Sequence, residues 1–317
     1  MTHPEVDSMT KQLFFAVVAF TLSLAVQAAD MRAVLITGAS SGIGKRTAEH
    51  LAAEGFFVYA GARKQKDLDM LNAMENVEAV RLDVTSAQDI EAAVAQVEKG
   101  GRGLYGIVNN AGVAMMQPLI EVEEDQLDFL FDVNVYGPYR ITKAFAPLLI
   151  ESQGRVVNMS SISGILSAPL MGPYSMSKHA LEAYNDSLAR EMARFNVKVA
   201  AIEPGNYSSK IGENALKRAQ ASGLRAEDSM FSKEMTAGLQ RASSRDGMAD
   251  PIAVAKAVHH ALESEQPKAR YMVVPNQREA EVTIRKLLRE LVEMNQGQEY
   301  SYDRDALVKM LDETLAM

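Results

Sequence analysis

Tyr174 and Lys178 stand four residues apart in a stretch whose pattern predicts a helix. This spacing places both side chains on one helix face, about one turn apart. A phenol with a pKa of about 10 is a poor acid-base catalyst at neutral pH, but a neighbouring ammonium favours the phenolate and lowers that pKa. A fixed positive charge at about 5 Å contributes roughly 3 kcal/mol at an effective dielectric constant near 20. Such a pair also arises by chance on helices, so its meaning depends on the rest of the chain.

A glycine-rich turn follows the first predicted strand, residues 33–36. Gly38, Gly42 and Gly44 would let the backbone turn tightly, approach a pyrophosphate and pack the next helix on the sheet. The N-terminus of that helix would then face the phosphates. A plain strand-helix connection is the alternative. The predicted dinucleotide contacts in this turn are Gly38, Ser40, Ser41, Gly42, Ile43 and Gly44.

The end of the second predicted strand, residues 57–60, bears on the choice of dinucleotide. Sites that select NAD place an acidic side chain there, on the ribose 2′-hydroxyl. This chain has Arg63 and Lys64 instead, and no acid before Asp67. Because Arg63 can make a paired contact to a phosphate and Lys64 adds a second positive charge, the sequence predicts NADP(H) over NAD(H). Two solvated residues after a strand are the alternative.

Polar and small residues also follow the third and fourth predicted strands, residues 77–82 and 106–109. Asp83 could accept a hydrogen bond from the adenine amino group, with Val84 beside it, or it could cap the following helix. Ligands of open α/β sheets bind at the carboxyl edge of the strands. Further cofactor contacts are therefore expected from Asn110, Ala111 and Gly112. An ordinary turn is the alternative.

Ser161 follows the fifth predicted strand, residues 155–159, and precedes Tyr174 by thirteen residues. A serine at that strand end points into the same cleft as the helix that carries Tyr174 and Lys178. It would supply a hydroxyl close to the phenol.

Short apolar segments alternate with amphipathic helical stretches from residue 32 onward. Continuous apolar strands separated by helices predict a parallel sheet covered on both faces, which is the doubly wound, Rossmann-type α/β fold. We expect about seven strands, with one domain over 31–275 and a C-terminal helical extension over 276–317. The remaining strands are predicted at 197–202 and 271–274, and the main helices at 43–54, 87–98, 133–151 and 174–194.

Two regions interrupt this alternation. Residues 206–250 are polar and lack a strand, which favours a helical lid over a cleft, with a flexible loop as the alternative. Residues 277–317 are charged and helical, and their apolar stripe is interpreted as a core-packing face. The lid side chains that could line an apolar pocket are Leu216, Leu224, Met230, Phe231, Met235 and Leu239, and the stripe of the extension is Leu287, Leu288, Leu291 and Met294.

The composition excludes several classes of function. A net charge of −8 and a pI of about 5.3 argue against nucleic-acid binding. The chain has no cysteine, which excludes disulfides, thiolate catalysis and zinc-cysteine sites. None of its five histidines has the spacing of a metal site, so no metal is expected.

The N-terminal segment, residues 1–30, has a basic start, an apolar run and small residues at its end. This pattern resembles a secretory signal, although the run is short for a membrane span. Three interpretations stay open: a cleaved signal, a membrane anchor formed by residues 11–29, or upstream sequence from a misplaced start codon.

Taken together, these segments resemble the short-chain dehydrogenase/reductase family. The resemblance covers about residues 32–275. The motifs that follow the family's order and spacing are the glycine-rich turn, Asn109-Asn110-Ala111-Gly112, Asn134, Ser161, Tyr174, Lys178 and Pro204-Gly205. Residues 133–137, 202–207 and 268–271 resemble the retinol and hydroxysteroid dehydrogenase branch.

The resemblance implies a role for each matching residue. Tyr174 would donate and accept the proton at the reacting oxygen, and Lys178 would hold the ribose hydroxyls of the nicotinamide and lower the Tyr174 pKa. Ser161 would hydrogen-bond the substrate oxygen, and Asn134 would hold a water that links Lys178 to solvent. Departures from the family pattern are a serine, Ser209, in place of threonine and Tyr207 in place of a small apolar residue. Pro204, Gly205 and Ser209 complete the expected cofactor contacts.

The expected function is therefore that of an NADP(H)-dependent oxidoreductase, interconverting an alcohol and a ketone or aldehyde on an apolar, retinoid-, steroid- or lipid-like substrate. A 3-oxoacyl-type ketoreductase, a non-catalytic dinucleotide sensor and a membrane-anchored interaction protein are the alternatives. The family resemblance implies a homodimer or homotetramer. A cytoplasmic location is expected, because NADP(H) is a cytosolic metabolite and no twin-arginine signal precedes the apolar run.

Overall fold

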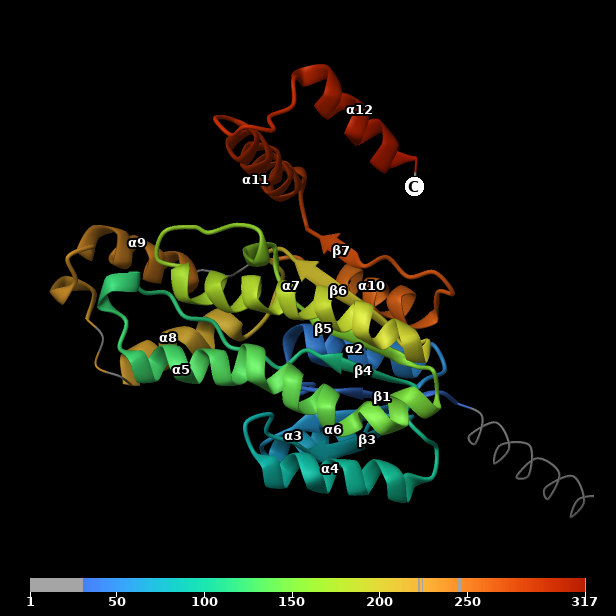
Figure 1. Ribbon diagram of the computed structural model, residues 1–317. Helices are drawn as coiled ribbons and strands as arrows, with labels where there is room; N and C mark the ends of the chain where they lie inside the picture. The colour runs from blue at the N-terminus through green and yellow to red at the C-terminus, as the bar shows by residue number, and fades with distance from the viewer. Residues whose placement is uncertain (1–30, 222, 224, 244–246, 317) are drawn as a thin grey trace, which may run out of the picture.

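The centre of the molecule is a parallel sheet of seven strands in the order β3-β2-β1-β4-β5-β6-β7 (Figure 1). The computed structural model describes residues 31–221, 223, 225–243 and 247–316. The strand order changes direction between β1 and β4, and this switch point is where doubly wound sheets bind ligands. The strands are β1 (Ala33–Ile36), β2 (Phe57–Ala62), β3 (Val77–Arg81), β4 (Gly106–Asn109), β5 (Arg155–Met159), β6 (Lys198–Pro204) and β7 (Arg270–Val273).

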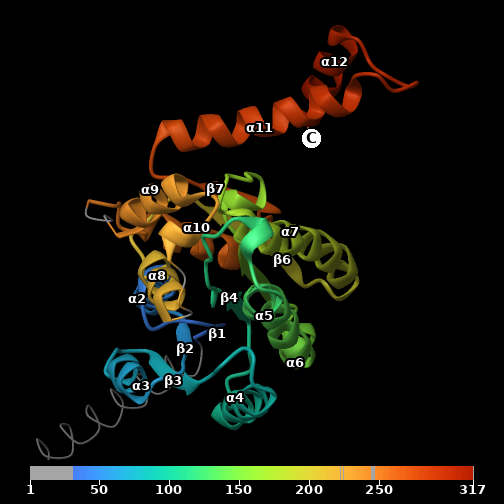
Figure 2. The same cartoon turned by 90° about the vertical axis from the view of Figure 1, so that its left-hand side faces the viewer.

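Helices cover both faces of this sheet, and each face has its own apolar core (Figure 2). Alternate residues of β1 point to opposite sides, so Val34 and Ile36 join one core while Leu35 joins the other. The first core is covered by α2 (Gly42–Ala53), α3 (Gln65–Asn72) and α10 (Ile252–Glu263), and the second by α4 (Ala87–Gly100), α6 (Gly137–Glu151) and α7 (Gly172–Met192). The predicted doubly wound fold is confirmed.

The helix predicted over residues 133–151 is in fact two segments. A π-helical turn, Asp132–Tyr136, follows α5 (Glu124–Phe131) and leads into α6. Such turns insert an extra residue into the helix and often mark functional sites. Asn134 lies inside this turn.

The region after β6 is helical, as the lid interpretation expects. It contains α8 (Ile211–Ala221) and α9 (Ser232–Ser243), joined through a short 3-10 segment, Ala226–Asp228. Other 3-10 segments are Leu119–Glu121, Ile162–Gly164 and Ala193–Phe195.

The C-terminal extension corrects one expectation. It consists of α11 (Gln277–Asn295) and α12 (Arg304–Leu315), which project away from the sheet (Figure 1). The apolar stripe on α11 is not a core-packing face, because its side chains are between 44% and 72% exposed. Thr283 is the buried residue of α11. The helical period shows which side of α11 is apolar, but it does not show whether another element covers that side. Because α11 projects away from the sheet, its apolar side does not pack on the core.

The expected signal or anchor, residues 1–30, lies outside the described residues. Within the part of the chain that the structure describes, no helix combines the length and apolar character needed to cross a bilayer.

Candidate active site

A pocket of about 1010 Å³ opens at the carboxyl edge of the sheet, between the strand ends and the lid. It brings together every predicted catalytic and cofactor residue except Asn134. The predicted residues that line it are Gly38, Ser40, Ser41, Gly42, Ile43, Gly44, Arg63, Asp83, Val84, Asn110, Ala111, Gly112, Ser161, Tyr174, Lys178, Pro204, Gly205 and Ser209. These residues are spread over more than 170 positions of the sequence, and folding of the chain brings them together in one pocket.

The glycine-rich turn is packed too tightly for side chains. Gly38 has a φ of +67°, and a Cβ there would lie 2.9 Å from the Cα of Ala111. A Cβ on Gly44 would lie 2.3 Å from Nδ2 of Asn110 and 2.4 Å from the carbonyl oxygen of Gly38. Asn110 fixes this geometry, because its Nδ2 donates to the carbonyl oxygens of Thr37 and Gly38. The turn after β1 is thereby tied to the end of β4.

The N-terminus of α2 meets the requirements of a phosphate site. Ser41 stands at the N-cap but its side chain makes no capping hydrogen bond, and the first turn contains no acidic residue. The N–H groups of a first helical turn have no partner within the helix, and they attract anions. Because the same turn lines the pocket, the chain fits the diphosphate of a dinucleotide there.

Arg63 and Asp83 meet where the second and third strands end. Nη1 of Arg63 donates to Oδ2 of Asp83 at 3.3 Å, while the other carboxylate oxygen accepts from the N–H and hydroxyl of Thr85. Burial alone raises the pKa of Asp83, but the hydrogen bonds from Thr85 and Arg63 outweigh it and hold that pKa below its usual value. The capping alternative for Asp83 is wrong, since Ser86 caps α4. Lys64 is not among the lining residues, so its predicted second charge lies outside the pocket wall.

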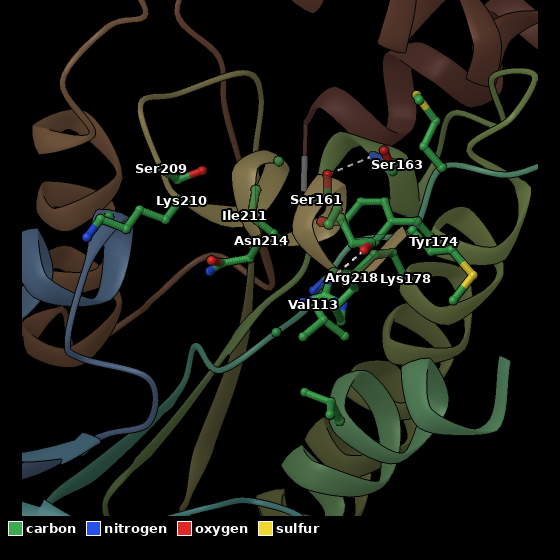
Figure 3. Close-up of a pocket in the computed structure, with 18 of the residues that line it drawn as sticks. Val113, Ser161, Ser163, Tyr174, Lys178, Ser209, Lys210, Ile211, Asn214 and Arg218 are labelled. Carbon is green, nitrogen blue, oxygen red and sulfur yellow. Dashed lines mark hydrogen bonds between the residues drawn. The ribbon is translucent and has the colours of Figure 1, made fainter. Parts of the chain in front are cut away.

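Tyr174 and Lys178 share one face of α7, as their spacing predicts (Figure 3). The Lys178 Nζ lies 5.7 Å from the centre of the Tyr174 ring and donates to the carbonyl oxygen of Met159 at 2.8 Å. Both side chains are buried. Burial lowers the pKa of Lys178 to about 8, and the carboxylate of Glu182 acts in the opposite direction.

Ser161 lies beside the Tyr174 ring (Figure 3). Its hydroxyl accepts from the backbone N–H of Ser163 at 3.1 Å and donates to the carbonyl oxygen of Pro204 at 3.4 Å. These contacts orient the hydroxyl between β5 and β6. The three polar groups that the chemistry needs, a phenol, an ammonium and a hydroxyl, therefore converge on one point of the pocket.

Asn134 stands behind the pocket wall. Its Oδ1 accepts from the N–H of Val113, and its Nδ2 donates to the carbonyl oxygen of Val113 and to the hydroxyl of Ser177. These bonds use both amide hydrogens and leave one lone pair on Oδ1 for a water. Through these hydrogen bonds, Asn134 holds the loop after β4 against α7, the helix that carries Tyr174 and Lys178.

The lid and the loops supply the apolar wall. Of the apolar lid residues predicted to line the pocket, Leu216 and Leu239 do so. Met235 is fully buried away from it, Met230 and Phe231 are exposed, and Leu224 lies outside the described residues. The sequence missed the loop residues of this wall, because residues outside helices and strands show no periodicity. They are Met115, Met116, Leu166, Leu170 and Met171, and the helix α5 adds Phe129 to the same wall.

Arg218 of α8 is a further lining residue that the sequence did not single out. Its Nη2 donates to the carbonyl oxygen of Ala114 at 2.8 Å, which joins the lid to the loop after β4. Burial, and the neighbouring charge of Arg63, lower the pKa of Arg218.

Two histidines come together away from the pocket. His50 on α2 and His259 on α10 stack edge to face at 5.3 Å, and with Glu54 they place one potential ligand atom each within 4.8 Å of one another. The two histidines are also paired with acids, His50 with Glu54 at 3.7 Å and His259 with Glu263 at 2.8 Å. This contact joins two helices, so spacing along the sequence did not reveal it.

Similarity to a known protein family shows to which family this chain belongs. The family model described as short chain dehydrogenase matches residues 32–220. The chain belongs to the short-chain dehydrogenase family. Members of this family are NAD(P)-dependent oxidoreductases, and the chain is therefore an enzyme of that kind.

Similar curated proteins include dehydrogenases and reductases from distant organisms. The chain is 32% identical to D-beta-hydroxybutyrate dehydrogenase, mitochondrial, of Mus musculus, over 79% of each chain. It is 35% identical to an NADPH-dependent 3-dehydrocapnine reductase of Ornithobacterium rhinotracheale, over 77% of this chain and 89% of that one. It is 33% identical to retinol dehydrogenase 7 of Mus musculus, over 75% and 79%. The expected likeness to the retinol and hydroxysteroid dehydrogenase branch is confirmed.

A solved structure shows the same fold. A short-chain dehydrogenase from Streptomyces avermitilis matches with a TM-score of 0.70 and 31% identity, over 84% of this chain and 96% of that one.

Proposed function

We propose that this short-chain dehydrogenase interconverts an alcohol and a ketone or aldehyde, using NADP(H) in preference to NAD(H). The observation that carries the proposal is the convergence of Ser161, Tyr174 and Lys178 in the pocket that also holds the glycine-rich turn. A non-catalytic sensor would need the turn but not the three converging polar groups.

The residues have separate tasks in the proposed reaction. A bound nicotinamide dinucleotide supplies the donor or acceptor of hydride. The Tyr174 hydroxyl gives a proton to the substrate oxygen during reduction and takes it back during oxidation. The Ser161 hydroxyl hydrogen-bonds the same oxygen and holds it at the phenol. The Lys178 ammonium lowers the pKa of Tyr174 and binds the ribose hydroxyls next to the nicotinamide.

The preference for NADP(H) rests on Arg63. It lines the pocket, its side chain is 63% exposed, and it has further N–H groups besides the one on Asp83. A 2′-phosphate can therefore bind to the guanidinium while the ion pair persists. The similarity to the NADPH-dependent 3-dehydrocapnine reductase of Ornithobacterium rhinotracheale lends additional support.

We also propose that the substrate is apolar. The support is the apolar wall formed by Met115, Met116, Phe129, Leu166 and Leu170 with the lid residue Leu216. Pockets of this kind bury most of an apolar ligand and use a few polar groups to orient it.

Oxidation of NADPH by purified protein, measured with a panel of carbonyl compounds, tests this function. The panel spans acetone, 3-oxo acids, long-chain 3-oxoacyl thioesters, ketosteroids and retinal. We expect the larger apolar carbonyls to give higher kcat/KM than acetone. A tenfold preference for small polar ketones would contradict the apolar substrate, and a 3-oxoacyl preference would select the ketoreductase alternative. Binding of NADPH without turnover of any carbonyl would favour a sensor.

We further propose a homodimer or homotetramer that works in the cytoplasm, with residues 31–275 as the catalytic domain and residues 276–317 as a helical extension. The exposed apolar side chains of α11 and α12 support contacts beyond the single chain. Light scattering on the purified chain gives the assembly, and fractionation that found a processed, active form outside the cytoplasmic membrane would overturn the location.

A further inference from the structure

A second cluster of charges lies behind the catalytic helix. Arg270 of β7 sits at its centre and reaches two acids on α7 and one on β6. Its Nε lies 3.1 Å from a carboxylate oxygen of Glu182 and 3.4 Å from one of Glu203, and its Nη2 lies 2.6 Å from Asp186. The cluster joins segments 202–207 and 268–271, which resemble the retinol and hydroxysteroid dehydrogenase branch. The roles proposed for the catalytic residues do not account for the acids and the arginine in these segments.

Two members of the cluster are buried carboxyl groups. The side chain of Glu203 is 3% exposed and that of Glu182 is 10% exposed, whereas that of Asp186 is 46% exposed. Two buried carboxylates that share one guanidinium leave an uncompensated negative charge, which is costly away from water. Burial, and then the charge of Glu182, raise the pKa of Glu203 to about 7. Near pH 7, Glu203 is therefore about half protonated.

Glu182 also faces the catalytic site. It follows Lys178 by one turn of α7, so the two side chains lie on the same helix face. A Cβ added to Gly164 would lie 2.9 Å from Cγ of Glu182 and 3.0 Å from the hydroxyl oxygen of Ser160. The carboxyl group is thus packed against the turn that follows β5, the strand whose last carbonyl oxygen accepts from Lys178.

The other end of the cluster reaches the same site through β6. Glu203 directly precedes Pro204, whose carbonyl oxygen accepts from the Ser161 hydroxyl. The charged groups around Glu182 are therefore Lys178 and Asp186 on its own helix, Glu203 on β6 and Arg270 on β7.

We propose that Glu182 is a positioning residue for the active site: its carboxylate keeps Lys178 charged, and Arg270, which also contacts Glu203, holds that carboxylate from β7. The proposal rests on the function proposed above for Lys178. It gives Arg270 a role in the reaction without contact to substrate or cofactor.

The proposal predicts a change in pH dependence. Lys178 loses its charge as the pH rises through its pKa, which burial has brought to about 8. Glu182→Gln removes the negative charge that opposes this loss, so the pKa of Lys178 falls further. We expect the alkaline limb of the pH profile to move to lower pH by about one unit.

The experiment measures the dissociation constant of NADPH by fluorescence between pH 6 and pH 10, alongside kcat/KM for whichever carbonyl the chain turns over. Asp186→Asn is the matched control, because Asp186 binds the same arginine from the same helix but is half exposed. We expect Glu182→Gln to shift both profiles, and Asp186→Asn to leave them within about 0.3 unit of wild type. Superimposable profiles for wild type and Glu182→Gln, or equal shifts in both variants, would overturn the proposal.

Glu182→Asp covers the case in which Glu182→Gln does not fold. It keeps the charge, so its alkaline limb should stay within about 0.3 unit of wild type while the cluster's packing changes. A shift as large as one unit in that variant would show that packing, not charge, acts on Lys178. The binding profile needs no known substrate. An unresponsive binding profile therefore counts against Glu182, whereas absence of turnover counts against the proposed activity.

Discussion

The guanidinium of Arg63 lies 3.3 Å from the carboxylate of Asp83, and this ion pair joins the ends of β2 and β3 at the edge of the pocket. The Arg63 side chain is 63% exposed and that of Asp83 is 29% exposed. Exposed pairs of this kind contribute about 0 to 1 kcal/mol to stability. The consequence is that Asp83 holds one nitrogen of Arg63 and so orients the guanidinium at the edge of the pocket.

Arg63→Ala should weaken NADPH binding and leave NADH binding unchanged. A hydrogen bond to a charged group contributes about 1.5–3 kcal/mol, which corresponds to roughly 10- to 150-fold in affinity. Dissociation constants for both cofactors, measured by fluorescence titration, check this. Arg81→Ala is the control, because Arg81 is an exposed arginine two residues before Asp83 and does not line the pocket. Equal wild-type affinities for the two cofactors would refute the preference.

Tyr174→Phe should lower turnover at least about 100-fold, the usual contribution of a general acid or base. The change keeps the ring and removes the hydroxyl, so the dissociation constant of NADPH should stay near that of wild type. Steady-state kinetics with the best carbonyl of the panel give the result. Tyr139→Phe serves for comparison, since Tyr139 is half exposed on α6 and outside the pocket. Turnover within fivefold of wild type would remove Tyr174 from the acid-base role.

Gly44→Ala should weaken NADPH and NADH alike, by tenfold or more. The added methyl group would collide with Asn110 and with the carbonyl oxygen of Gly38, and so displace the turn that would hold the diphosphate. Gly55→Ala separates binding from stability. Gly55 has a φ of +87° and nothing within 4 Å, so an alanine there is strained by about 1–2 kcal/mol but far from the cofactor. If both variants lose affinity equally, the turn has no special part in binding.

Glu203→Gln should make the free energy of unfolding less dependent on pH. The folded protein holds the Glu203 proton up to about pH 7, whereas the unfolded chain releases it near its ordinary pKa of 4.5. The stability that Glu203 contributes is therefore fully present below pH 4.5 and is lost as the pH rises to about 7. Glutamine does not titrate, so the variant gains on wild type over this range.

The expected gain of Glu203→Gln at pH 8 is between about 1 and 3 kcal/mol, at about 1.4 kcal/mol per pKa unit. Urea unfolding at pH 5 and pH 8 measures it. Glu213→Gln is a control with an exposed carboxyl group on α8. A difference between Glu203→Gln and wild type that is the same at both pH values would contradict the raised pKa.

The local sequence pattern was sufficient to predict the strands of the sheet and the common helix face of Tyr174 and Lys178 on α7. An apolar run such as 33–36 can only be buried on both faces, which identifies β1 and its parallel neighbours. The spacing of Tyr174 and Lys178 fixes their common face, because the helix has 3.6 residues per turn. The glycines at 38, 42 and 44 likewise mark a turn that no larger residue could adopt.

The tertiary structure decided which of these groups meet, and what covers them. Asn134 was predicted to hold a water, and the structure adds that its amide joins Val113 to Ser177 behind the pocket wall. The stripe on α11 was predicted from its period, yet a period shows only which side of a helix is apolar and not whether a neighbour reaches it. The cluster of Glu182, Glu203 and Arg270 is assembled from a helix and two strands that are far apart in the chain. Glu182 and Glu203 are buried beside Arg270, which strengthens their interaction with its charge. Burial of that kind depends on the packing of whole elements rather than on the sequence around each residue.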